Sequence, residues 1–549
     1  MIVDDLLCDN IKCQINNNNS LSYSQIPVMK KLLTATLLCI SLSAAAQLNV
    51  HVPTIDEVGA TRLPADIAPV HAPFSVPAFK KPVFPKYTIT IKGQGTSQTK
   101  EIQQAIDAVS KKGGGTVIIP AGNWHSGRIT LKSNVNLHLE ENAVLEFGGE
   151  ISDYLPVVFT RTEGVEVMSL GACIYANGQR NIAVTGKGKL VGPPANCPVR
   201  KQVMRQDVIE NVVAANKPVA QRIYDGHDGG PVYLPMFVSA VNCKNVYLEG
   251  LQLENTPFWN IVPIYCDNVI IRGITVNSVG IPSGDGIDIE SSKNVLIEYC
   301  TLNCGDDCFT LKAGRGEDGL RIGRPTENII IRYSLARQGH GGITVGSETA
   351  AMIRNLYVHD VVFDDTEVGL RFKTRRPRGG GGENLHYERI RMRLRLDAFR
   401  WDMLGARMYV GALADRLPAL PVNKLTPVYR NIYAKDIVVD SARALVRVDG
   451  IPESPMTGFH LENVEAHCTK FIQSIDANDI SISNANIYTT DSAVTLTDTR
   501  NITFDKVHII NPANKVVVNI SGELTDNIRF SNSTPAKPEG WETSTWKKN

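Results

Sequence analysis

The 549-residue sequence has little of what marks several common protein classes. Its 57 Lys and Arg are balanced by 56 Asp and Glu, so it lacks the basic excess that nucleic-acid-binding proteins carry. It has 11 cysteines and no Cys-x-x-Cys pair, which excludes a disulfide scaffold and gives no sign of a metal site. Aromatic residues make up only 7%, but hydrophobic residues reach 43%, which excludes a disordered chain. We therefore expect a globular protein with no cofactor, no metal and no nucleic-acid partner.

A long hydrophobic run is also lacking. The most apolar stretch follows Met29 and is shorter than the roughly 20 residues that a membrane-spanning helix needs, so we expect no membrane span. Two lysines precede this stretch and the small residues Ala44–Ala46 follow it, as in a secretory signal peptide. We predict a signal peptide at residues 29–46, a start assigned too early for residues 1–28, and export to a bacterial periplasm or the extracellular space. The pairing of the remaining cysteines and the oligomeric state stay open.

What the chain does contain begins with a proline-rich segment. Proline at this density predicts an extended arm at residues 47–92 rather than a domain with its own core. Apolar residues at helical spacing predict a helix over 98–112, and Gly113–Gly115 end it before a strand predicted at 116–120. The pattern indicates a short capping helix on a β structure that spans 93–535, followed by a C-terminal tail at 536–549.

A repeat decides the predicted fold. An asparagine followed by alternating apolar residues recurs 23 to 34 residues apart, at Asn245, Asn268, Asn294, Asn328, Asn355 and Asn384. Fainter copies begin at Asn134, Asn181, Asn431, Asn463, Asn501 and Asn527. A β-sandwich or a propeller would use hairpin turns, and a propeller blade needs about 40 residues. Units of this length favour an all-β solenoid, a single-stranded right-handed parallel β-helix, in which one continuous core serves the whole length.

Two segments break the repeat. Residues 196–234 and 394–428 carry no clean copy of it and are rich in Arg, Pro and Met. Insertions in a solenoid form loops on one face, which is often the binding face. Both segments flank the coils that carry the most unusual charged residues, so we expect them to border a site there.

These charged residues recur at the period of the repeat. Acids occur at Asp285 and at Asp306–Asp307, a histidine between glycines at His340, and an Arg-Phe-Lys run at Arg371–Lys373. Adjacent coils lie about 4.8 Å apart, so four consecutive coils are predicted to bring these side chains to one patch. Three neighbouring acids repel one another, which raises at least one pKa. An acid that keeps its proton beside ionised ones is the pairing that cleaves glycosides.

Each of the other residues near this patch has either a functional or a purely structural interpretation. Trp259 falls one coil before Asp285 and either stacks on a sugar ring or packs in the core. Lys312 and Arg315 follow the acid pair and supply either a second carboxylate contact or surface charge. Arg375 adds to the positive charge after Lys373, which suits an anionic sugar or belongs to a surface loop.

The charged blocks resemble the signature blocks of the polygalacturonase family of glycoside hydrolases, family 28. The family reads Asn-Thr-Asp, Asp-Asp, Gly-His-Gly and Arg-Ile-Lys, and this chain reads Ser283-Gly-Asp, Gly305-Asp-Asp, Gly339-His-Gly and Arg371-Phe-Lys in the same order. The resemblance covers roughly residues 90–530. It implies a pectin-lyase-like β-helix that hydrolyses α-linked galacturonic acid, in pectic polysaccharide or oligogalacturonides, by single displacement with inversion and without a metal.

The resemblance also implies roles for the acids. Asp306 would protonate the leaving oxygen, Asp285 and Asp307 would activate the water, and His340 would tune the acid or hold the geometry. Inversion leads us to expect acid and base carboxyl groups roughly 6.5–9.5 Å apart, against about 5–5.5 Å in retaining enzymes. Ser283 replaces an asparagine that in the family helps to orient the neighbouring acid.

The resemblance assigns Arg371 and Lys373 to the carboxylate of the galacturonate at the cleavage point. Phe372 replaces the isoleucine of this block. Related rhamnogalacturonan hydrolases typically change the Asp-Asp pair and the histidine. Because Asp307 and His340 are kept here, the resemblance favours a galacturonide-cleaving member, of the bacterial exo-acting type.

Three hypotheses remain at this point. The first is the hydrolase; it acts on chain ends if the two insertions wall off the cleft, and the alternatives within it are an endo-polygalacturonase or a rhamnogalacturonan-directed hydrolase. The second is a calcium-dependent pectate lyase, in which the Gly-His-Gly block would have no role. The third is a non-catalytic carbohydrate-binding or structural solenoid, which would tolerate Asp306→Asn.

Overall fold

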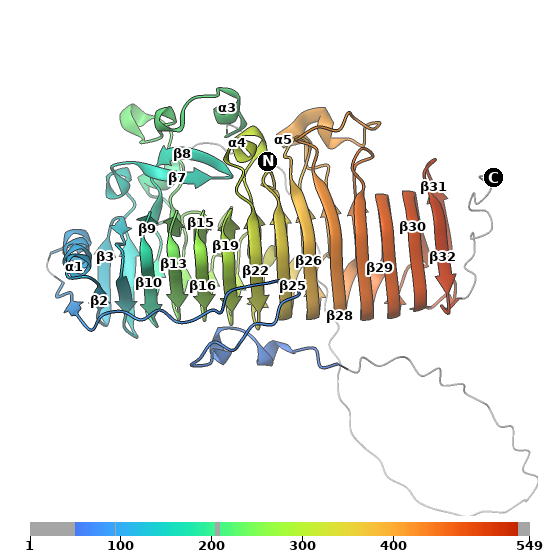
Figure 1. Cartoon of the computed structure of the whole chain (residues 1–549), viewed down its shortest axis with the longest axis horizontal. Coiled ribbons are helices and arrows are strands. Elements are labelled where there is room, and N and C mark those ends of the chain that lie inside the picture. The colour runs from blue at the N-terminus through green and yellow to red at the C-terminus, as the bar shows by residue number, and fades with distance from the viewer. Residues whose placement is uncertain (1–49, 94, 204–208, 536–549) are drawn as a thin grey trace, which may run out of the picture. The chain divides into compact units, whose positions relative to one another are not determined.

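Short parallel strands stacked one coil upon the next make up most of the chain (Figure 1). The structure, a computed structural model, describes residues 50–93, 95–203 and 209–535. The predicted signal peptide at 29–46, the segment at 1–28 and the tail at 536–549 lie outside these residues. Thirty of the described strands are linked in one continuous ladder whose pairs are parallel, which confirms the predicted parallel β-helix.

The ladder strands follow in chain order. The first coils contain β1 Thr88–Thr90, β2 Gly115–Ile119, β3 Gly122–Ser126, β4 Ile129–Thr130, β5 Val135–Leu139, β6 Ala143–Phe147, β9 Ala172–Asn177, β10 Arg180–Gly186 and β11 Lys189–Val191. The central coils contain β12 Met236–Val241, β13 Lys244–Glu249, β14 Gln252–Glu254, β15 Ile261–Ile264, β16 Asp267–Arg272, β17 Thr275–Asn277, β18 Ile287–Glu290, β19 Lys293–Glu298, β20 Thr301–Asn303, β21 Phe309–Lys312, β22 Thr326–Arg332, β23 Leu335–Ala336 and β24 Gly339–Gly346. The last coils contain β25 Ile353–Lys373, β26 Gly381–Leu394, β27 Asp397–Asp402, β28 Val428–Asp449, β29 Met456–Thr489, β30 Ala493–Ile510, β31 Val517–Ser521 and β32 Asp526–Ser531.

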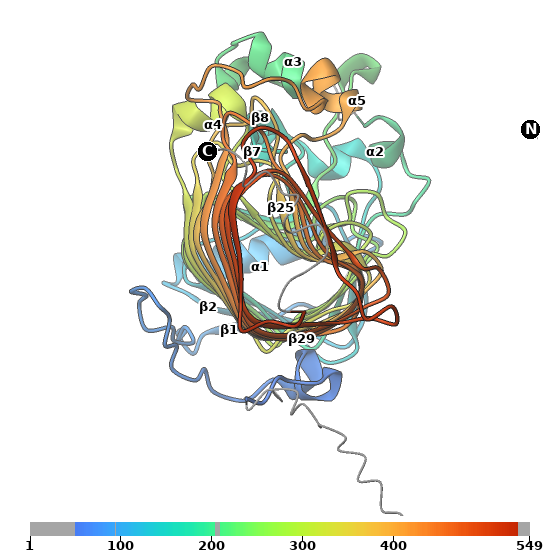
Figure 2. The ribbon, with the colours of Figure 1, turned by 90° about the vertical axis from the view of Figure 1, so that its right-hand side faces the viewer.

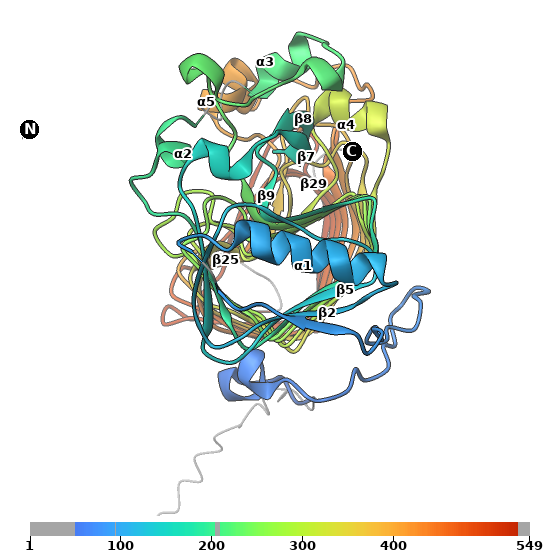
Figure 3. The same ribbon diagram turned by 90° about the vertical axis from the view of Figure 1, so that its left-hand side faces the viewer.

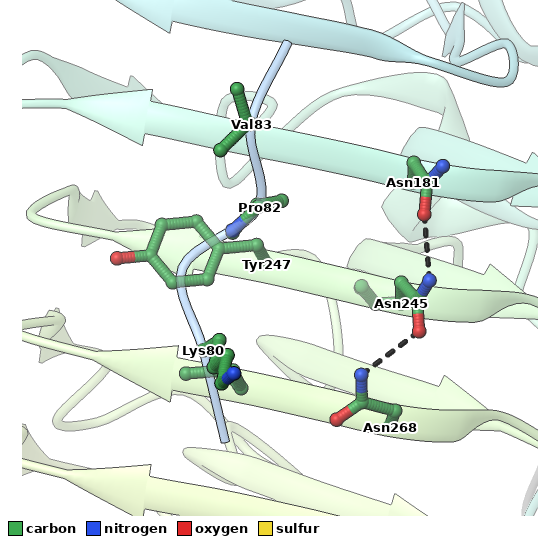
Figure 4. A pocket seen from close by; sticks show the side chains of 9 residues that line it. Lys80, Pro82, Val83, Asn181, Asn245, Tyr247 and Asn268 are labelled. Carbon is green, nitrogen blue, oxygen red and sulfur yellow. Dashed lines mark hydrogen bonds between the residues drawn. The ribbon is translucent and has the colours of Figure 1, made fainter. Parts of the chain in front are cut away.

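The repeated asparagines explain the coil period. Each of the twelve adopts a left-handed backbone with φ between 52° and 63°, which asparagine tolerates better than most residues. Their side chains bond from coil to coil: Asn245 donates to Asn181 at 2.6 Å and Asn268 donates to Asn245 at 2.9 Å (Figure 4). The left-handed residue thus sets where each coil bends, and the side-chain bonds join the turns of neighbouring coils.

Stacked aliphatic side chains fill the interior. One column runs through Val246, Val269, Val295, Ile329 and Leu356 in register, and all five are buried. Each such side chain contributes about 1.5–3 kcal/mol when it leaves water. Because every coil adds to the same column, the core is one continuous cluster along the helix.

A helix closes the N-terminal end of this core. α1, Thr99–Lys111, lies across the end of the coils (Figure 3) and buries Ile102, Ala105, Ile106 and Val109. These are the residues whose spacing predicts the helix, and they join the interior cluster. Without the cap, the edge of the first coil would expose its apolar interior and its backbone groups.

The proline-rich segment runs along the outside of the coils (Figure 1). It contains two short 3₁₀ turns, η1 Ile55–Glu57 and η2 Ala60–Arg62. Further on, Phe79 covers an outward-facing apolar column that includes Tyr247, Ile270 and Leu296. The first ladder strand, β1, already pairs with β2 before residue 93, the predicted boundary; three residues are too few to show a strand period.

Ion pairs fasten the same segment. Arg272 and Arg332 both donate to the buried carboxylate of Glu298, at 2.9 Å through each Nε. Their remaining nitrogens donate to backbone carbonyls of the segment, from Arg272 to Pro64 and from Arg332 to Ala68. The arginines thereby link two coils to a segment that has few backbone hydrogen bonds of its own.

Irregular segments gather along one edge of the coils, opposite the proline-rich segment (Figure 2). The segment predicted at 196–234 contains α2 Pro198–Lys201, α3 Ile209–Ala214, η5 Val219–Gln221 and η6 His227–Gly229. The second predicted insertion, at 394–428, starts later than expected because β27 pairs with β25 and β28. β27 begins with the buried Asp397, which pairs with Arg443 at 2.7 Å. Because this acid interrupts the alternation of apolar residues, the sequence pattern does not indicate the strand. Two short helices follow it, α5 Arg407–Val410 and η7 Gly411–Ala414.

Two further interruptions were not predicted. An antiparallel hairpin of β7, Val158–Thr162, and β8, Val165–Ser169, follows the short η3, Ile151–Tyr154, and α4, Gly316–Ile322, follows β21. Both lie at the same edge as the insertions (Figure 2). Among the described residues, no helix is long and apolar enough to cross a membrane.

Candidate active site

The stacking of β18, β21, β24 and β25 assembles the predicted patch. Ile287 lies beside Phe309, and the same offset sets Asp285 beside Asp307. The next coil sets His340 beside Asp306, and the backbone N–H of His340 donates to the Asp306 carbonyl at 3.0 Å. Arg371 lies beside Thr344, which lies beside Thr310, three positions after Asp307, and it reaches Asp307 through its long side chain. The period of the repeat thus brings all six predicted residues together.

The three acids form one tight group. An oxygen of Asp285, one of Asp306 and one of Asp307 all lie within 4.8 Å of one another. Asp285 and Asp307 are buried, whereas the Asp306 side chain keeps 26% of its surface exposed. The spacing between these oxygens is shorter than the roughly 6.5 Å separation expected for inversion. Asp306 is therefore the acid most open to a ligand.

His340 is the partner of Asp306. Its Nδ1 lies 3.0 Å from Oδ1 of the aspartate. This hydrogen bond raises the pKa of His340, although partial burial opposes the shift. Burial would raise the pKa of Asp306, but the hydrogen bond from His340 and the charge of Lys373 outweigh it, so the pKa lies below its usual range. In the free protein the two groups thus favour an ion pair.

Asp307 is held by the two predicted cations. Nη1 of Arg371 donates to Oδ1 at 2.9 Å, and Nζ of Lys373 lies 3.7 Å from Oδ2. Gly341 leaves room for this carboxylate: a Cβ there would lie 2.8 Å from Oδ1 of Asp307 and 2.2 Å from the hydroxyl oxygen of Thr344. The glycine after the histidine is therefore required by the close approach of Asp307.

The acid with the raised pKa is Asp285. Burial is the main cause, and the neighbouring charge of Asp288 adds to it. The sequence predicts that at least one acid of the cluster has a raised pKa, without saying which, and Asp288 is not among the predicted site residues. That residue is fully buried, and burial raises its pKa as well. The alternation of Ile287-Asp-Ile-Glu290 was a usable signal, because an acid between two core residues must point to the other face of the strand.

For Lys312 and Arg315 the surface-charge interpretation is wrong, and their contact with a substrate carboxylate stays a prediction. Both are buried, so they are not surface charge, and both are paired with the protein's own carboxylates. Nζ of Lys312 lies 3.1 Å from Glu348 and 3.6 Å from Asp288. Arg315 pairs with Glu348 at 3.0 Å and with Glu163 at 2.7 Å.

Glu348 connects the two cations, and sequence reasoning missed it. Burial alone would raise its pKa, but the charges of Lys312, Arg378 and Arg315 hold it well below the usual range. No repeat signal marks Glu348, because it follows the strand β24 in a turn. The negative charge of Glu348 compensates the positive charges of Lys312 and Arg315, which are buried beside the acids.

A pocket of about 100 Å³ opens above the acids. Trp259 lines it, stacks on Phe258 with ring centroids 4.7 Å apart, and lies 4.6 Å from Nζ of Lys312. The rim includes Glu163 from the turn between β7 and β8, and Arg375, whose guanidinium lies 4.3 Å above the ring of Tyr409. Segments from three separate parts of the sequence therefore enclose the space over the acids.

Predicted residues reach this pocket in different ways. The three acids and Lys373 line it directly, together with Trp259, Lys312, Arg315 and Arg375. His340 and Arg371 act on it through Asp306 and Asp307, to which they bond. The ring of Trp259 is buried, so it packs in the core, and it also borders the pocket. Its stacking on a sugar ring stays a prediction.

The three clustered acids, Asp285, Asp306 and Asp307, are also candidate ligands for a calcium ion. Carboxylate oxygens are the ligands that Ca²⁺ takes. Arg371 and Lys373 already pair with Asp307, and His340 with Asp306, so the protein's own cations compete for the oxygens that an ion would need. The donor set fits acid–base chemistry better than it fits a divalent cation.

Comparison with known proteins agrees with the motif resemblance. The sequence model of "Glycosyl hydrolases family 28" matches residues 227–394, which contain all four blocks. A probable polygalacturonase of Vitis vinifera is 28% identical over 383 residues, 68% of this chain and 71% of that protein. The exo-poly-alpha-D-galacturonosidase of Dickeya chrysanthemi is 27% identical over 55% of this chain and 54% of its own length.

A solved structure extends the likeness beyond the site. The hyperthermoactive exopolygalacturonase from Thermotoga maritima is 29% identical and superposes with a TM-score of 0.64, over 78% of this chain and 93% of that one. The β-helix, the four blocks in order and these relatives together support the resemblance of the chain to the polygalacturonases of glycoside hydrolase family 28.

Proposed function

We propose that the protein is an exported hydrolase that removes α-linked galacturonic acid from the ends of pectic chains, with inversion. The observation that carries this proposal is the pocket itself, which three carboxylates line together with Lys373 and in which Asp306 remains open to a ligand. Both relatives named as exo-acting support the action on chain ends.

Asp306 is the proposed general acid. It is the most exposed of the three acids, so a glycosidic oxygen can approach it directly. In the free protein its pKa is lowered, and a lowered pKa opposes this role. A bound galacturonate carboxylate neutralises Lys373, one of the charges that lower the pKa, so substrate binding restores the proton that the acid must donate.

Asp285 and Asp307 are the proposed pair that activates water. Asp307 pairs with Arg371 and Lys373, and its carboxylate is proposed to accept a proton from a water beside it. Asp285 lies within 4.8 Å of it and has the raised pKa. The short spacing between nearest oxygens leaves the stereochemistry to direct measurement: proton NMR of the first product should show the β-anomer for inversion, and the α-anomer would establish retention.

The enclosure of the pocket supports action on chain ends. An endo-acting enzyme needs a groove open at both ends, whereas here the hairpin residue Glu163 stands on one side and Arg375 with Tyr409 on another. The walls come from the β7–β8 hairpin and from the segment after β27. Arg375 and Lys373 are the cations available for a terminal galacturonate.

Product analysis on polygalacturonic acid tests the proposal. We expect monomer from the first time point, with no intermediate ladder, and loss of at least ~10³-fold in rate for Asp306→Asn. A ladder of oligomers would establish an endo-acting enzyme, and an unsaturated product that absorbs in the ultraviolet would establish a lyase. An unchanged rate in Asp306→Asn would leave a carbohydrate-binding solenoid.

An activated substrate assigns the proton donor. A 4-nitrophenyl galacturonide has a leaving group that needs no protonation, so Asp306→Asn should regain much of its activity on it. Asp285→Asn is the matched control, since a residue that handles the water gains nothing from a better leaving group. Recovery in Asp285→Asn and not in Asp306→Asn would exchange the two roles.

Export is part of the proposal and rests on the signal-like segment at residues 29–46. Mass spectrometry of the protein recovered from the periplasm or medium of an expressing bacterium should find an N-terminus at Gln47. A cytoplasmic protein that retains residues 29–46 would refute export.

A further inference from the structure

Among the three acids of the pocket, Asp285 differs from the other two in its lack of a counter-ion. Asp306 bonds to His340 at 3.0 Å. Asp307 pairs with Arg371 at 2.9 Å. In the part of the chain that the structure describes, no cation forms an ion pair with Asp285, and its buried Oδ1 has no hydrogen-bond partner. A buried carboxylate without a counter-ion is costly, so we expect this carboxyl group to keep its proton.

A buried cation, Lys312, lines the same pocket but is held by other carboxylates. Its Nζ lies 3.1 Å from Oε2 of Glu348 and 3.6 Å from Oδ1 of Asp288. Burial would lower the pKa of Lys312, but the charges of Glu348 and Asp288 outweigh it, so the pKa lies well above its usual range. Lys312 is therefore a charged ammonium group whose ion-pair partners are these two residues and not Asp285.

Asp288 is the member of this group that the proposed reaction leaves without a role. It lies between the core residues Ile287 and Ile289 of β18, so its side chain points to the other face of the strand. It is fully buried, and neither of its oxygens has a hydrogen-bond partner among the described residues. It does not line the pocket, so it acts on a ligand there only through its neighbours.

Asp285 and Asp288 compete for the ammonium group of Lys312. Burial raises the pKa of both acids. After burial, Lys312 is the strongest influence on Asp288 and opposes the rise. At Asp285 the repulsion from Asp288 and Asp306 exceeds the attraction of Lys312. The ammonium group therefore favours an ionised Asp288 and leaves the proton on Asp285.

The other charged groups beside Asp288 do not reverse this order. Glu290 lies on the same face of β18, and Nε of Arg161 is 3.7 Å from its Oε2. Burial raises the pKa of Glu290 to about 7, so this group is mostly neutral below neutral pH. Arg315 is paired with Glu348 at 3.0 Å, and like Lys312 it is thus already compensated.

We propose that Asp285 stores the proton that Asp306 donates to the leaving oxygen, and that Asp288 is a positioning residue for this store because it keeps the ammonium group of Lys312 away from Asp285. The inference rests on the proposed hydrolysis and names where its proton resides before the substrate binds. It also gives the buried pair of Asp288 and Lys312 a role in the reaction that neither could have by touching the cleaved bond.

The proton follows a closed cycle. When a galacturonate carboxylate neutralises Lys373, Asp306 takes the proton from Asp285; their oxygens lie within 4.8 Å, a distance that one bridging hydroxyl group spans. Asp306 then donates this proton to the glycosidic oxygen as the bond from C1 to that oxygen breaks, and the oxygen of a water molecule bonds to C1. The proton that the water loses passes to the pair of Asp285 and Asp307 and ends on Asp285, which restores the free state.

Difference infrared spectroscopy tests the store without catalysis. A protonated carboxyl group has its own C=O band, and Asp285→Asn should remove one such band from the free protein below neutral pH. Bands of other protonated acids, such as Glu290, remain in the variant and cancel in the difference. With galacturonate bound, Asp306→Asn should remove the band instead. If Asp285→Asn removes no band from the free protein, or if galacturonate binds and the band stays on Asp285, the proposal is overturned.

Two variants should move this band in opposite directions. Asp288→Asn frees the ammonium group to pair with Asp285, so it should lower the pH at which the band disappears by at least ~1 pH unit. Lys312→Met removes the ammonium group and should raise this pH. In the Lys312→Met background, Asp288→Asn should keep no more than about half of its effect. An equal shift in both backgrounds would mean that Asp288 acts without Lys312 and overturns the proposal.

Asp436→Asn is the matched control for these spectra. Asp436 is a buried acid outside the site, at a left-handed turn position with φ of 57°, which asparagine accepts. The exchange should leave the band of Asp285 and its pH dependence unchanged. A shift as large as that in Asp288→Asn would show that removal of any buried carboxylate has this effect, which overturns the role of Asp288.

Kinetics of Asp288→Asn separate a positioning role from a structural one. On polygalacturonic acid, kcat should fall at least ~10-fold while KM stays within ~2-fold, because Asp288 does not line the pocket. On 4-nitrophenyl galacturonide, whose leaving group needs no proton, kcat should fall less than ~2-fold. Equal losses on the two substrates, or a loss carried by KM, would establish a structural role.

The spectra and the kinetics distinguish this proposal from the proposed function. If no pectic substrate is cleaved but the free protein shows the band of Asp285 and its two shifts, the hydrolysis fails and the stored proton stands. If polygalacturonic acid is cleaved and the band is absent, the store fails alone. The wild-type spectrum and that of Asp285→Asn decide the store even if Asp288→Asn does not fold.

Discussion

The imidazole of His340 and the carboxylate of Asp306 face each other across two adjacent coils, with Nδ1 of the histidine 3.0 Å from Oδ1 of the aspartate. The pair exists because the two residues occupy the same position of successive repeats, and the β-helix turns that sequence period into contact. Its pKa shifts have opposite signs, raised for the histidine and lowered for the aspartate.

Stability should therefore depend on pH through this pair. Asp306 has a lowered pKa in the folded protein, so its contribution is present above about 4 and is lost as the pH falls. His340 has a raised pKa, so its contribution is full below about 6.5 and is lost as the pH rises through the raised value. The window of full stabilisation runs from about pH 4 to about pH 6.5.

His340→Gln tests this window. Both side chains are partly exposed, so the loss should be about 1 kcal/mol or less. Thermal unfolding of wild type and variant from pH 3 to pH 9 should show the largest difference inside the window and a smaller one at either extreme. A difference that stays constant over this range would mean that the pair is not ionised in the folded protein.

Gly341→Ala should lower kcat by more than its loss of stability explains. The added methyl would lie 2.8 Å from Oδ1 of Asp307, so the carboxylate must move, and we expect kcat to fall at least ~10²-fold with about 1–3 kcal/mol lost in unfolding. Gly369→Ala is the matched control: its methyl would lie 2.6 Å from the sulfur of Met392, away from the acids. It should cost similar stability and retain kcat. Equal losses of kcat in both variants would contradict the role of Gly341.

Glu298→Gln should weaken the attachment of the proline-rich segment. The change leaves Arg272 and Arg332 buried with less compensating charge, which costs about 3–5 kcal/mol. Chemical unfolding measures the loss, and limited proteolysis should show faster cleavage between residues 64 and 84. Glu317→Gln removes an exposed partner of Lys424 and should cost less than 1 kcal/mol. Similar losses for the two variants would show that Glu298 does not fasten the segment.

Chelation of divalent ions should leave activity unchanged. Lys373 and Arg371 hold Asp307, and His340 holds Asp306, so the acids carry out acid–base chemistry without an ion. Activity on polygalacturonic acid before and after treatment with EDTA, and again after addition of Ca²⁺, measures this directly. A loss that Ca²⁺ restores would favour the lyase.

Much of the site was accessible from the sequence because it follows the repeat. Asp306 and His340 could be aligned by counting residues from each coil's asparagine, and the structure places them beside each other. Arg371 lies in the register of Thr310, three positions after Asp307, which counting did not resolve, but its side chain spans the difference.

Residues outside the repeat were not accessible in this way. Glu163 reaches the pocket from the turn of the β7–β8 hairpin, and Tyr409 reaches it from the segment after β27. The burial of Lys312 and its compensation by Glu348 likewise depend on what covers the coil, which no local pattern encodes. The boundary of the second insertion was wrong because β27 carries a buried acid, Asp397.

The sequence by itself determined the coil and its register. An asparagine that accepts a left-handed backbone, followed by alternating apolar residues, recurs often enough to specify each turn and each inward-facing side chain, and a one-dimensional stack then aligns the acids. Only the tertiary structure decided the shape and electrostatics of the pocket. Its walls come from insertions that are distant in sequence, and the pKa of each acid depends on burial and on charges brought in by folding.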